Sequence, residues 1–379
     1  MANDRYRILI VSVSAAAEEM RLRLADVGFI AIEIVDYDTL FEHFQDVLPD
    51  LILLTKSGGS SSLLLTSQVV RRYPMIPVVV VATERHGESL REHLDAGASD
   101  YIYYEGAEKE LLGFVVRQNL EHRLHLQAIA AQEETAMRYA QLERDQRSGF
   151  RVQQSMLPKS PGAIRGLTFD HHLYPSMIMS GDFIDYFELS GGRVAFYIAD
   201  VSGHGASSAF VTVLLKSMSR RLLDEQSRLQ STVDILSWFN KELLQWGMEQ
   251  HVTMFLGLID QEERRLEYSS AAHFPGTILC HENGAGFLEI GGQPLGLFAE
   301  PNYLSYQVEL PKRYCIVMFS DGVFEILPET SLEDKEARLL NLVSTNRNAG
   351  LDALVNDLGV LTAKSIPDDI AVFSVASAG

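Results

Sequence analysis

The chain of 379 residues has little of what several protein classes require. Its two cysteines, Cys280 and Cys315, provide neither a disulfide framework nor the ligand spacing of a zinc site. No run of about 18 apolar residues occurs, and residues 1–7 are too polar for a signal peptide. We therefore expect a cytoplasmic protein of a reducing compartment, with no membrane as partner.

Basic residues are also scarce, because 32 Lys and Arg stand against 51 Asp and Glu, and the formal net charge is −19. Binding to nucleic acid or to anionic lipid needs a basic surface that displaces counterions. The composition thus argues against general affinity for nucleic acid and favours a protein or a cation as partner. The length predicts two or three domains.

In residues 1–120, apolar runs typical of buried parallel strands alternate with helical patterns. The strands are expected at 7–11, 51–54 and 78–81, and the helices near 15–27, 61–73 and 86–96. This alternation predicts an α/β domain with a doubly wound parallel sheet.

Residues 108–157 have almost no Pro or Gly, and their apolar residues recur at helical spacing among charges. They predict a long connecting helix, which pairs with its copy as a coiled coil in a homodimer or packs on its own domain. In residues 158–379 the pattern changes to short strands with turn signals and segregated helices. That pattern predicts a largely antiparallel, layered α+β domain.

Four acidic motifs stand beside strand-like runs in this last part, and four together predict one shared site. They are Ser180-Gly181-Asp182-Phe183-Ile184-Asp185, Asp200-Val201-Ser202-Gly203-His204-Gly205, Ser320-Asp321-Gly322 and Asp368-Asp369. Oxygen ligands without a Cys or His cluster suit Mn²⁺ or Mg²⁺ rather than zinc. Two such ions activate a water for attack on a phosphoryl group, so hydrolysis of a phosphate ester is expected.

Residues 148–376 resemble the SpoIIE/RsbU-type serine phosphatases of the metal-dependent PPM superfamily, and the resemblance implies a PPM-type phosphatase domain. It rests on the four motifs together with Gln153-Gln154-Ser155-Met156-Leu157-Pro158, Ala271-Ala272-His273 and Gly291-Gly292-Gln293-Pro294-Leu295-Gly296-Leu297. It implies that Asp182 and Asp200 hold two metal ions, with the backbone carbonyl of Val201 as a further ligand. Asp321 and either Asp368 or Asp369 would complete the centre, the family pattern favouring Asp368. These carboxylates would act through a metal-activated water.

Two further residues of the motifs have less direct roles. Asp185 matches the family pattern as a carboxylate that supports the ligands. For His204 there are two interpretations, a proton donor to the leaving seryl oxygen or a structural or phosphate-facing residue of its loop, and the second is favoured. For His273 a packing role is favoured.

The chain departs from the family pattern at three positions. Ser180 and Ala272 stand where Gly is usual, and Phe324 stands where a small polar residue often follows Ser-Asp-Gly-Val. None of these changes removes a proposed ligand.

Residues 6–120 resemble a response-regulator receiver domain. The places of its metal-binding acids, phosphate acceptor, hydroxyl and Lys hold Ser12 and Val13, Thr55, Ala82 and Tyr104. Without carboxylates there is neither a metal site nor an acyl-phosphate acceptor, so we interpret the domain as a pseudo-receiver. For Thr55, at the degenerate acceptor position, and for Ser57 and Thr83 there are two interpretations, a site of some other modification or a solvent-facing loop hydroxyl, and the second is favoured. Control by dimerisation or partner binding is expected instead of aspartyl phosphorylation.

The leading hypothesis is a phosphoserine or phosphothreonine protein phosphatase. By resemblance, its substrate would be a phosphorylated STAS-type anti-anti-sigma factor of a partner-switching stress pathway. The alternative is a non-catalytic regulatory scaffold that binds signalling partners. The acidic residues favour the phosphatase, because only the first domain has lost them.

Overall fold

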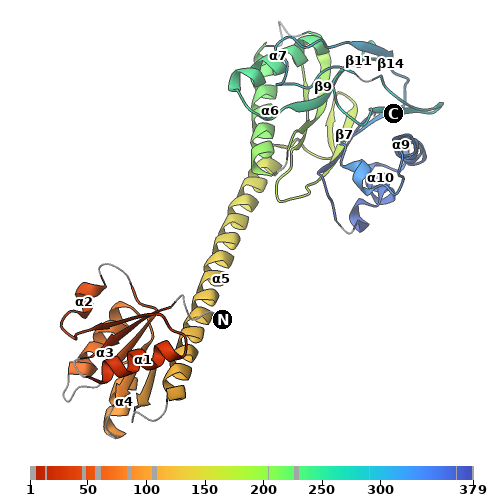
Figure 1. Ribbon diagram of the computed structural model, residues 1–379. Helices are drawn as coiled ribbons and strands as arrows, with labels where there is room; N and C mark the ends of the chain where they lie inside the picture. Colours follow the sequence, from red (N-terminus) through yellow and green to blue (C-terminus); the bar gives the residue numbers. More distant parts are fainter. Residues whose placement is uncertain are drawn as a thin grey trace. The chain divides into compact units, whose positions relative to one another are not determined.

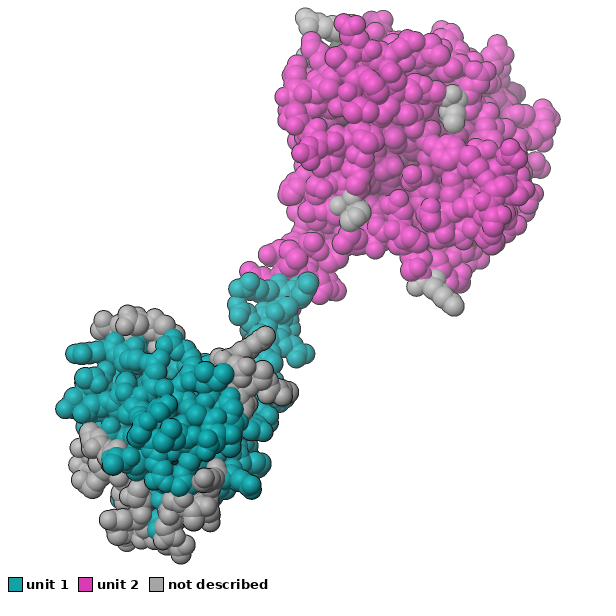
Figure 2. All heavy atoms as spheres, viewed as in Figure 1, with its two compact units in different colours: residues 1–139 teal, residues 140–379 magenta. Residues whose placement is uncertain are grey.

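A computed structural model describes most of the chain. The chain divides into two compact units, residues 1–139 and 140–379 (Figure 2). The described residues are 6–12, 15–44, 48–55, 61–82, 87–104, 109–203, 205–225, 230–289, 291–363 and 365–377. None of the helices in these segments combines the length and the apolar character that a membrane span needs. The division between the units falls inside a helix, so the expected domain boundaries stay predictions.

The first unit is built on a five-stranded parallel sheet of order β2-β1-β3-β4-β5 (Figure 1). Its strands are β1 (Arg7–Val11), β2 (Ala31–Val35), β3 (Leu51–Thr55), β4 (Val78–Ala82) and β5 (Asp100–Tyr103). Its helices are α1 (Ala16–Asp26), α2 (Leu40–His43), α3 (Ser61–Arg72), α4 (Gly87–Asp95) and the first turns of α5 (Lys109–Met156). Every residue of β3 and β4 is buried, which explains their unbroken apolar sequences. The predicted doubly wound sheet is confirmed.

The carboxyl ends of these strands carry no acid at the four described receiver positions. Those positions hold Ser12, Thr55, Ala82 and Tyr104. The Thr55 side chain is buried at 5% exposure, and its Oγ1 donates a hydrogen bond to the Val11 carbonyl oxygen at 3.1 Å. The expectation that Thr55 faces solvent is therefore wrong, because its hydroxyl joins β3 to β1. Val13, Ser57 and Thr83 lie outside the described residues.

Helix α5 is 48 residues long and confirms the predicted connecting helix, apart from Glu108, which lies outside the described residues. Its first turns bury Leu112, Val116 and Leu120 in the core of the first unit. Residues 124–145 are exposed throughout. The predicted pairing of this stretch with a second copy stays a prediction.

The second unit has four layers, with two antiparallel sheets packed face to face between pairs of helices (Figure 1). One sheet has the order β14-β11-β10-β9-β8, and the other has the order β13-β12-β15-β16-β7-β6. Separate apolar cores fill the space between the sheets and the space between each sheet and its helices. The predicted layered α+β domain is confirmed.

The elements of this unit are the expected strands and segregated helices. Its strands are β6 (Gly162–Ile164), β7 (Leu167–Tyr174), β8 (Asp182–Glu188), β9 (Arg193–Val201), β10 (Val252–Asp260), β11 (Arg265–Ala271), β12 (Ile278–His281), β13 (Gly284–Phe287), β14 (Tyr306–Glu309), β15 (Tyr314–Phe319) and β16 (Ile370–Ser377). Its helices are α6 (Ala206–Glu225), α7 (Thr232–Trp246), α8 (Val323–Ile326), α9 (Leu332–Asn346) and α10 (Leu351–Leu358), with short 3₁₀ turns η2 (Ser190–Gly192) and η3 (Val360–Thr362). Helices α6 and α7 contribute to the core on one sheet, and α9 and α10 to the core on the other.

Candidate metal centre

Asp182 and Asp200 face each other across two neighbouring strands. Asp182 is the first residue of β8, and its register partner on antiparallel β9 is Asp200. Directly opposite residues of an antiparallel pair project to the same face of the sheet, where their side chains are neighbours. Asp182 is buried at 1% exposure, whereas Asp200 is partly exposed. The pair therefore forms a wall with a deep carboxylate and an accessible one.

Ser320 connects this wall to the other sheet. Its hydroxyl donates a hydrogen bond to Asp182 Oδ2 at 2.7 Å and accepts one from the Ala371 backbone N–H at 2.8 Å. Ser320 follows β15 and Ala371 lies in β16, so a single hydroxyl joins both strand ends to Asp182. The motifs that contain Asp321 and Asp368 are brought to the same place.

Gly322 allows a still closer approach of these two motifs. A Cβ atom at this position would lie 2.1 Å from the Asp369 carbonyl oxygen, a distance that real side chains do not adopt. The turn after β15 therefore packs its backbone directly against the Asp368–Asp369 peptide.

Burial and the charges of neighbouring carboxylates raise the pKa of three acids of the cluster. Burial raises the pKa of Asp182 well above its usual range, and the charge of Asp200 raises it further. The pKa of Asp200 is raised to about 7 by burial and then by Asp321, Asp368 and Asp369. The pKa of Asp321 is raised by burial and by Asp368. All five carboxylates thus belong to one electrostatic cluster.

The adjacent residues Asp368 and Asp369 have different surroundings. Asp369 Oδ1 accepts hydrogen bonds from the Ser176 backbone N–H at 2.6 Å and the Ser176 hydroxyl at 2.8 Å, and its Oδ2 accepts one from the Gly181 N–H at 2.7 Å. Asp369 is buried, whereas Asp368 is exposed. The geometry therefore favours Asp368 as the ligand of the pair and gives Asp369 the task of holding residues 176–181.

The backbone of the Asp200 motif adds oxygen atoms beside the carboxylates. A Cβ atom on Gly181 would lie 2.9 Å from the Val201 carbonyl oxygen and 3.4 Å from the Gly203 carbonyl oxygen. Gly181 directly precedes Asp182, so both carbonyl groups approach the chain next to the buried carboxylate. A larger residue at this position would fill the space that these oxygens approach.

The donor set fits a hard divalent cation in chemistry and in charge. It consists of carboxylate and carbonyl oxygens, the ligands that Mn²⁺ and Mg²⁺ prefer. Burial and mutual repulsion raise the pKa values of Asp182 and Asp200, and a bound cation would offset both effects. Within the described part of the chain, no three His, Cys, Asp or Glu side chains lie close enough together to enclose a metal ion. The structure thus assembles the carboxylates into one cluster but not into a closed cage.

Asp185 does not join the cluster. It lies three residues from Asp182, and side chains alternate along a strand, so the two point to opposite faces of β8. Asp185 is buried and accepts a hydrogen bond from Lys216 Nζ of α6 at 2.8 Å. This ion pair ties α6 to the sheet. His204, the other residue expected in a supporting role, lies outside the described residues.

The three departures from the family pattern each have a structural setting. Ser180 Oγ accepts a hydrogen bond from the Asp182 N–H at 3.0 Å. Ala272 has φ of 56°, in the left-handed region that glycine adopts most easily. Phe324 is buried, with its ring centroid 5.3 Å from that of Phe274. None of the three displaces a carboxylate of the cluster.

His273 has the packing role that was favoured. Its side chain is buried, and its Nε2 lies 3.0 Å from the Phe319 carbonyl oxygen at the end of β15. Burial lowers the pKa of His273 to about 4. The ring is therefore neutral near pH 7, and its Nε2–H donates to that carbonyl.

Gln153 is a site residue that the sequence did not single out. Its Nε2 donates hydrogen bonds to the Ser180 carbonyl oxygen at 2.6 Å and to Thr212 Oγ1 at 2.9 Å. Its Oε1 accepts one from the Ser180 N–H at 3.3 Å. The feature that could have identified it is an uncharged polar residue on the buried face of a helix. Gln153 lies in the stretch 153–158, which contributed only to the family resemblance. Gln153 joins the last turns of α5 to α6 and to the residue before Gly181-Asp182.

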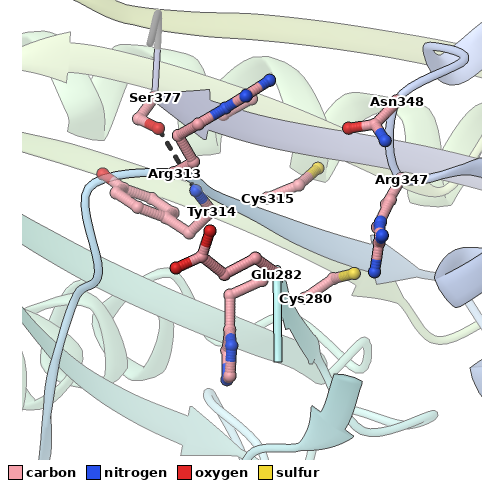
Figure 3. A pocket seen from close by; sticks show the side chains of 10 residues that line it. Cys280, Glu282, Arg313, Tyr314, Cys315, Arg347, Asn348 and Ser377 are labelled. Atoms are coloured by element: carbon pink, nitrogen blue, oxygen red, sulfur yellow. Dashed lines mark hydrogen bonds between the residues drawn. The ribbon is translucent and has the colours of Figure 1, made fainter. Parts of the chain in front are cut away.

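A separate cavity of about 220 Å³ does not provide a second candidate catalytic site. Cys280 and Cys315 are register partners on β12 and β15 and both line it, beside Glu282, Arg313 and Arg347 (Figure 3). Burial raises the pKa of Cys315 to about 12 and also raises that of Cys280. Neither thiol is an effective nucleophile at neutral pH.

Comparisons with known proteins agree with this architecture. The family model for Stage II sporulation protein E (SpoIIE) matches residues 190–377. Phosphoserine phosphatase RsbU of Bacillus subtilis (strain 168) is 26% identical over 185 residues, which cover 48% of this chain and 54% of that protein. The SiaA-PP2C domain of Pseudomonas aeruginosa has a TM-score of 0.55 at 17% identity, covering 63% of this chain and 98% of that chain. At this low sequence identity, the structural similarity to the SiaA-PP2C domain shows a shared fold and nothing more.

A different protein matches with higher identity over a shorter stretch. The phosphate regulon transcriptional regulatory protein PhoB of Klebsiella pneumoniae is 34% identical over 110 residues, which are 28% of this chain and 48% of that protein. Together with the five-stranded parallel sheet, this similarity supports a receiver-like first unit. The chain spans about half the length of the curated relatives that it matches.

Proposed function

Because the C-terminal domain belongs to the SpoIIE family of PPM-type serine phosphatases, we propose that this protein is a metal-dependent phosphatase that hydrolyses phosphoserine or phosphothreonine in a protein substrate. The single observation that carries the proposal is the carboxylate cluster, in which Asp182 faces Asp200 across two strands. An all-oxygen cluster of this charge is suited to Mn²⁺ or Mg²⁺.

The proposed ligands of two such ions are Asp182, Asp200, the Val201 carbonyl group, Asp321 and Asp368. When bound, the ions supply an activated water and polarise the phosphoryl oxygens. The protein's own contribution is position. Ser320 fixes the deep carboxylate of Asp182, and Asp369 holds the segment that leads into it.

The proposed substrate is a phosphorylated STAS-type anti-anti-sigma factor in a partner-switching stress pathway. The family resemblance supports this proposal, as does the similarity to RsbU, which is named a phosphoserine phosphatase. The action would take place in the cytoplasm.

The proposed regulation combines the receiver-like unit with a homodimer formed through α5. Exposed apolar side chains recur along this helix, among them Leu124, Ile129, Met137 and Leu142. A helix that exposes such residues is typical of one that pairs with another helix. The receiver-like unit would then act through dimerisation or partner binding.

The test is release of phosphate from a phosphoserine protein by the purified full chain, with and without Mn²⁺. We expect activity that depends on Mn²⁺ and that falls by about 100-fold or more in Asp200→Asn, because several kcal/mol of transition-state stabilisation would be lost. The matched control is Asp224→Asn, which removes an exposed carboxylate on α6.

Calorimetric titration with Mn²⁺ separates the phosphatase from the alternative, a non-catalytic regulatory scaffold. The phosphatase requires Mn²⁺ binding that Asp200→Asn weakens and Asp224→Asn preserves. If the protein neither bound Mn²⁺ nor released phosphate from any phosphoserine protein, the phosphatase proposal would be contradicted and the scaffold alternative would be favoured.

A further inference from the structure

A groove of about 660 Å³ lies between the last turns of α5 and residues 175–178. Three arginines of α5 line it, Arg144, Arg147 and Arg151, which lie on one face of the helix because their spacing is three and four residues. Phe150 and Met177 supply apolar surface. No acidic residue is among the described residues that line the groove.

The wall opposite the helix is continuous with the carboxylate cluster. Met177 Sδ lies 4.0 Å from the place of a Cβ atom on Gly205, in the loop that follows Asp200. Ser176 is held by Asp369, as described above. On the helix side, a Cβ atom on Gly149 would lie 2.9 Å from Met179 Sδ, so the helix packs closely on this segment. A chain bound in the groove would therefore lie beside the proposed catalytic centre.

The guanidinium groups in this groove are available to a ligand. Among the described residues, neither Arg144 nor Arg151 has a carboxylate partner, and Arg151 donates only to Ser148 Oγ at 3.2 Å. Arg147 pairs with Glu143 at 2.6 Å, but both side chains are exposed and such a pair is weak. In a protein with a formal net charge of −19, a wall of three arginines without an acid is a local exception.

We propose that this groove binds an acidic segment of the phosphoprotein substrate that flanks the phosphorylated residue. The segment's carboxylates pair with Arg144, Arg147 and Arg151, and an apolar side chain of the segment contacts Phe150 and Met177. The inference rests on the proposed phosphatase function. It adds a specificity site to it, because most of an acidic surface repels an anionic substrate and this groove attracts one.

The spacing of the arginines sets the length of the segment. Arg144 and Arg151 are seven positions apart in the helix, which corresponds to about 10 Å. An extended peptide rises about 3.3 Å per residue, so about three or four residues span the same distance. The probe should therefore carry acidic residues and one leucine within a stretch of about four residues.

The experiment measures kcat/KM of the full chain with Mn²⁺ on phosphoserine peptides. The test peptides carry a Glu-rich stretch with one Leu on either the N-terminal or the C-terminal side of the phosphoserine. Each has a matched control peptide in which Gln replaces Glu. We expect one acidic placement to give kcat/KM about tenfold above its Gln partner at low salt, through KM, since three exposed charge pairs act together. The advantage should shrink at about 0.5 M salt.

The test variant is Arg144→Gln/Arg147→Gln/Arg151→Gln, which should lose this advantage and retain its rate on the Gln-rich peptide. The control Arg313→Gln/Arg338→Gln/Arg347→Gln changes the net charge equally but away from the groove, and it should keep the advantage. Circular dichroism checks that both variants fold. A single Arg151→Gln substitution, which should lose part of the advantage, serves if the triple variant unfolds.

Fluorescence anisotropy with an unphosphorylated acidic peptide separates this inference from the proposed function. If the wild type binds this peptide and the groove variant does not, the groove proposal is supported even when no phosphopeptide is hydrolysed. Absence of hydrolysis would then contradict only the proposed phosphatase function. Equal kcat/KM on the acidic and Gln-rich peptides, or equal binding by wild type and groove variant, overturns the groove. If the wild type is a dimer, the groove variant is a monomer and neither differs in its response to the peptides, the groove proposal is also overturned. That result would assign this face of α5 to contact with a second copy of the chain.

Discussion

At the scale of single residues, Asp368 and Asp369 show how neighbours of the same type acquire different tasks. Asp369 accepts three hydrogen bonds from backbone and hydroxyl donors, and Asp368 faces solvent. We expect Asp369→Asn to lower the free energy of unfolding by about 1–3 kcal/mol, because an amide N–H₂ would face a donor. We expect Asp368→Asn to change it by less than about 0.5 kcal/mol, as is usual for an exposed position.

Urea unfolding and Mn²⁺ titration together check this assignment. Asp368→Asn should weaken Mn²⁺ binding at nearly unchanged stability. If Asp369→Asn kept its stability and lost more Mn²⁺ affinity than Asp368→Asn, the two roles would have to be exchanged.

His273 makes a prediction about pH. Burial lowers its pKa from the usual value of 6.5 to about 4, so between these values the unfolded chain binds a proton that the folded protein does not. Its contribution to stability is complete above about pH 6.5 and is lost as the pH falls toward 4. At pH 5 the loss is about 2 kcal/mol, since each pKa unit corresponds to about 1.4 kcal/mol.

The measurement compares urea unfolding at pH 7.5 and pH 5 for the wild type and His273→Gln. The variant retains a side-chain donor but does not titrate, so its loss on acidification should be smaller by about 2 kcal/mol. His171, whose pKa burial also lowers to about 4, is present in both proteins and cancels. Identical pH dependence in the two proteins would show that His273 is not the titrating group.

The residue types of the candidate site were predictable from sequence, and their surroundings were not. Acids at strand ends indicated the cluster, because carboxylates at a buried edge are costly unless they have a function. The hydrogen bonds of Asp369 come from Ser176 and Gly181, almost 200 positions away in the chain. The burial of Thr55 depends likewise on a contact with β1. Such long-range partners have no local sequence pattern.

At the scale of elements, the alternation of side chains between the two faces of a strand explains which carboxylates lie together. Asp182 and Asp200 share a face, whereas Asp185 projects toward α6 and Lys216. Central strands such as β4 and β9 were predictable, because burial on both faces gives them unbroken apolar runs. The edge strands β14 and β2 are only half-buried and carry mixed residues, and β2 is absent from the strands expected in residues 1–120.

Gln153 makes the prediction that belongs to this scale. It joins the end of α5 to Ser180 and to Thr212 of α6 by hydrogen bonds in a buried place. We expect Gln153→Leu to cost about 1–3 kcal/mol of stability, because the Ser180 backbone loses its partner, and to weaken Mn²⁺ binding through displacement of Asp182. The control is Gln154→Leu, at an exposed position of the same helix, where both quantities should stay unchanged.

Denaturant unfolding and Mn²⁺ titration of both variants check the connection. A Gln153→Leu protein with reduced stability and unaltered Mn²⁺ affinity would show that the contact only fastens the helix. A loss of affinity at Gln154 as large as at Gln153 would contradict the stated geometry.

At the scale of the whole molecule, the two units keep different parts of their chemistry. The carboxylate cluster of the second unit is assembled, whereas the described receiver positions of the first are Ser12, Thr55, Ala82 and Tyr104. The sequence predicted this contrast directly, since it depends on residue identity. It did not predict which surfaces of α5 stay exposed, because exposure depends on what each unit covers.

The contrast leads to a prediction about small phosphodonors such as acetyl phosphate. Transfer of the phosphoryl group to a receiver requires an acceptor carboxylate and a bound Mg²⁺ ion, and the described strand ends provide neither. The Thr55 hydroxyl is buried and already donates to the Val11 carbonyl oxygen, so it does not replace the carboxylate. We expect no gain of a phosphoryl group by intact mass and no change in phosphatase rate after incubation with acetyl phosphate and Mg²⁺. A Thr55→Asp variant should behave in the same way, because it restores the acceptor without the acids that hold the ion. If the wild-type rate rose on this treatment, the receiver-like unit would have kept its chemistry, and control through dimerisation or a partner would lose its main argument.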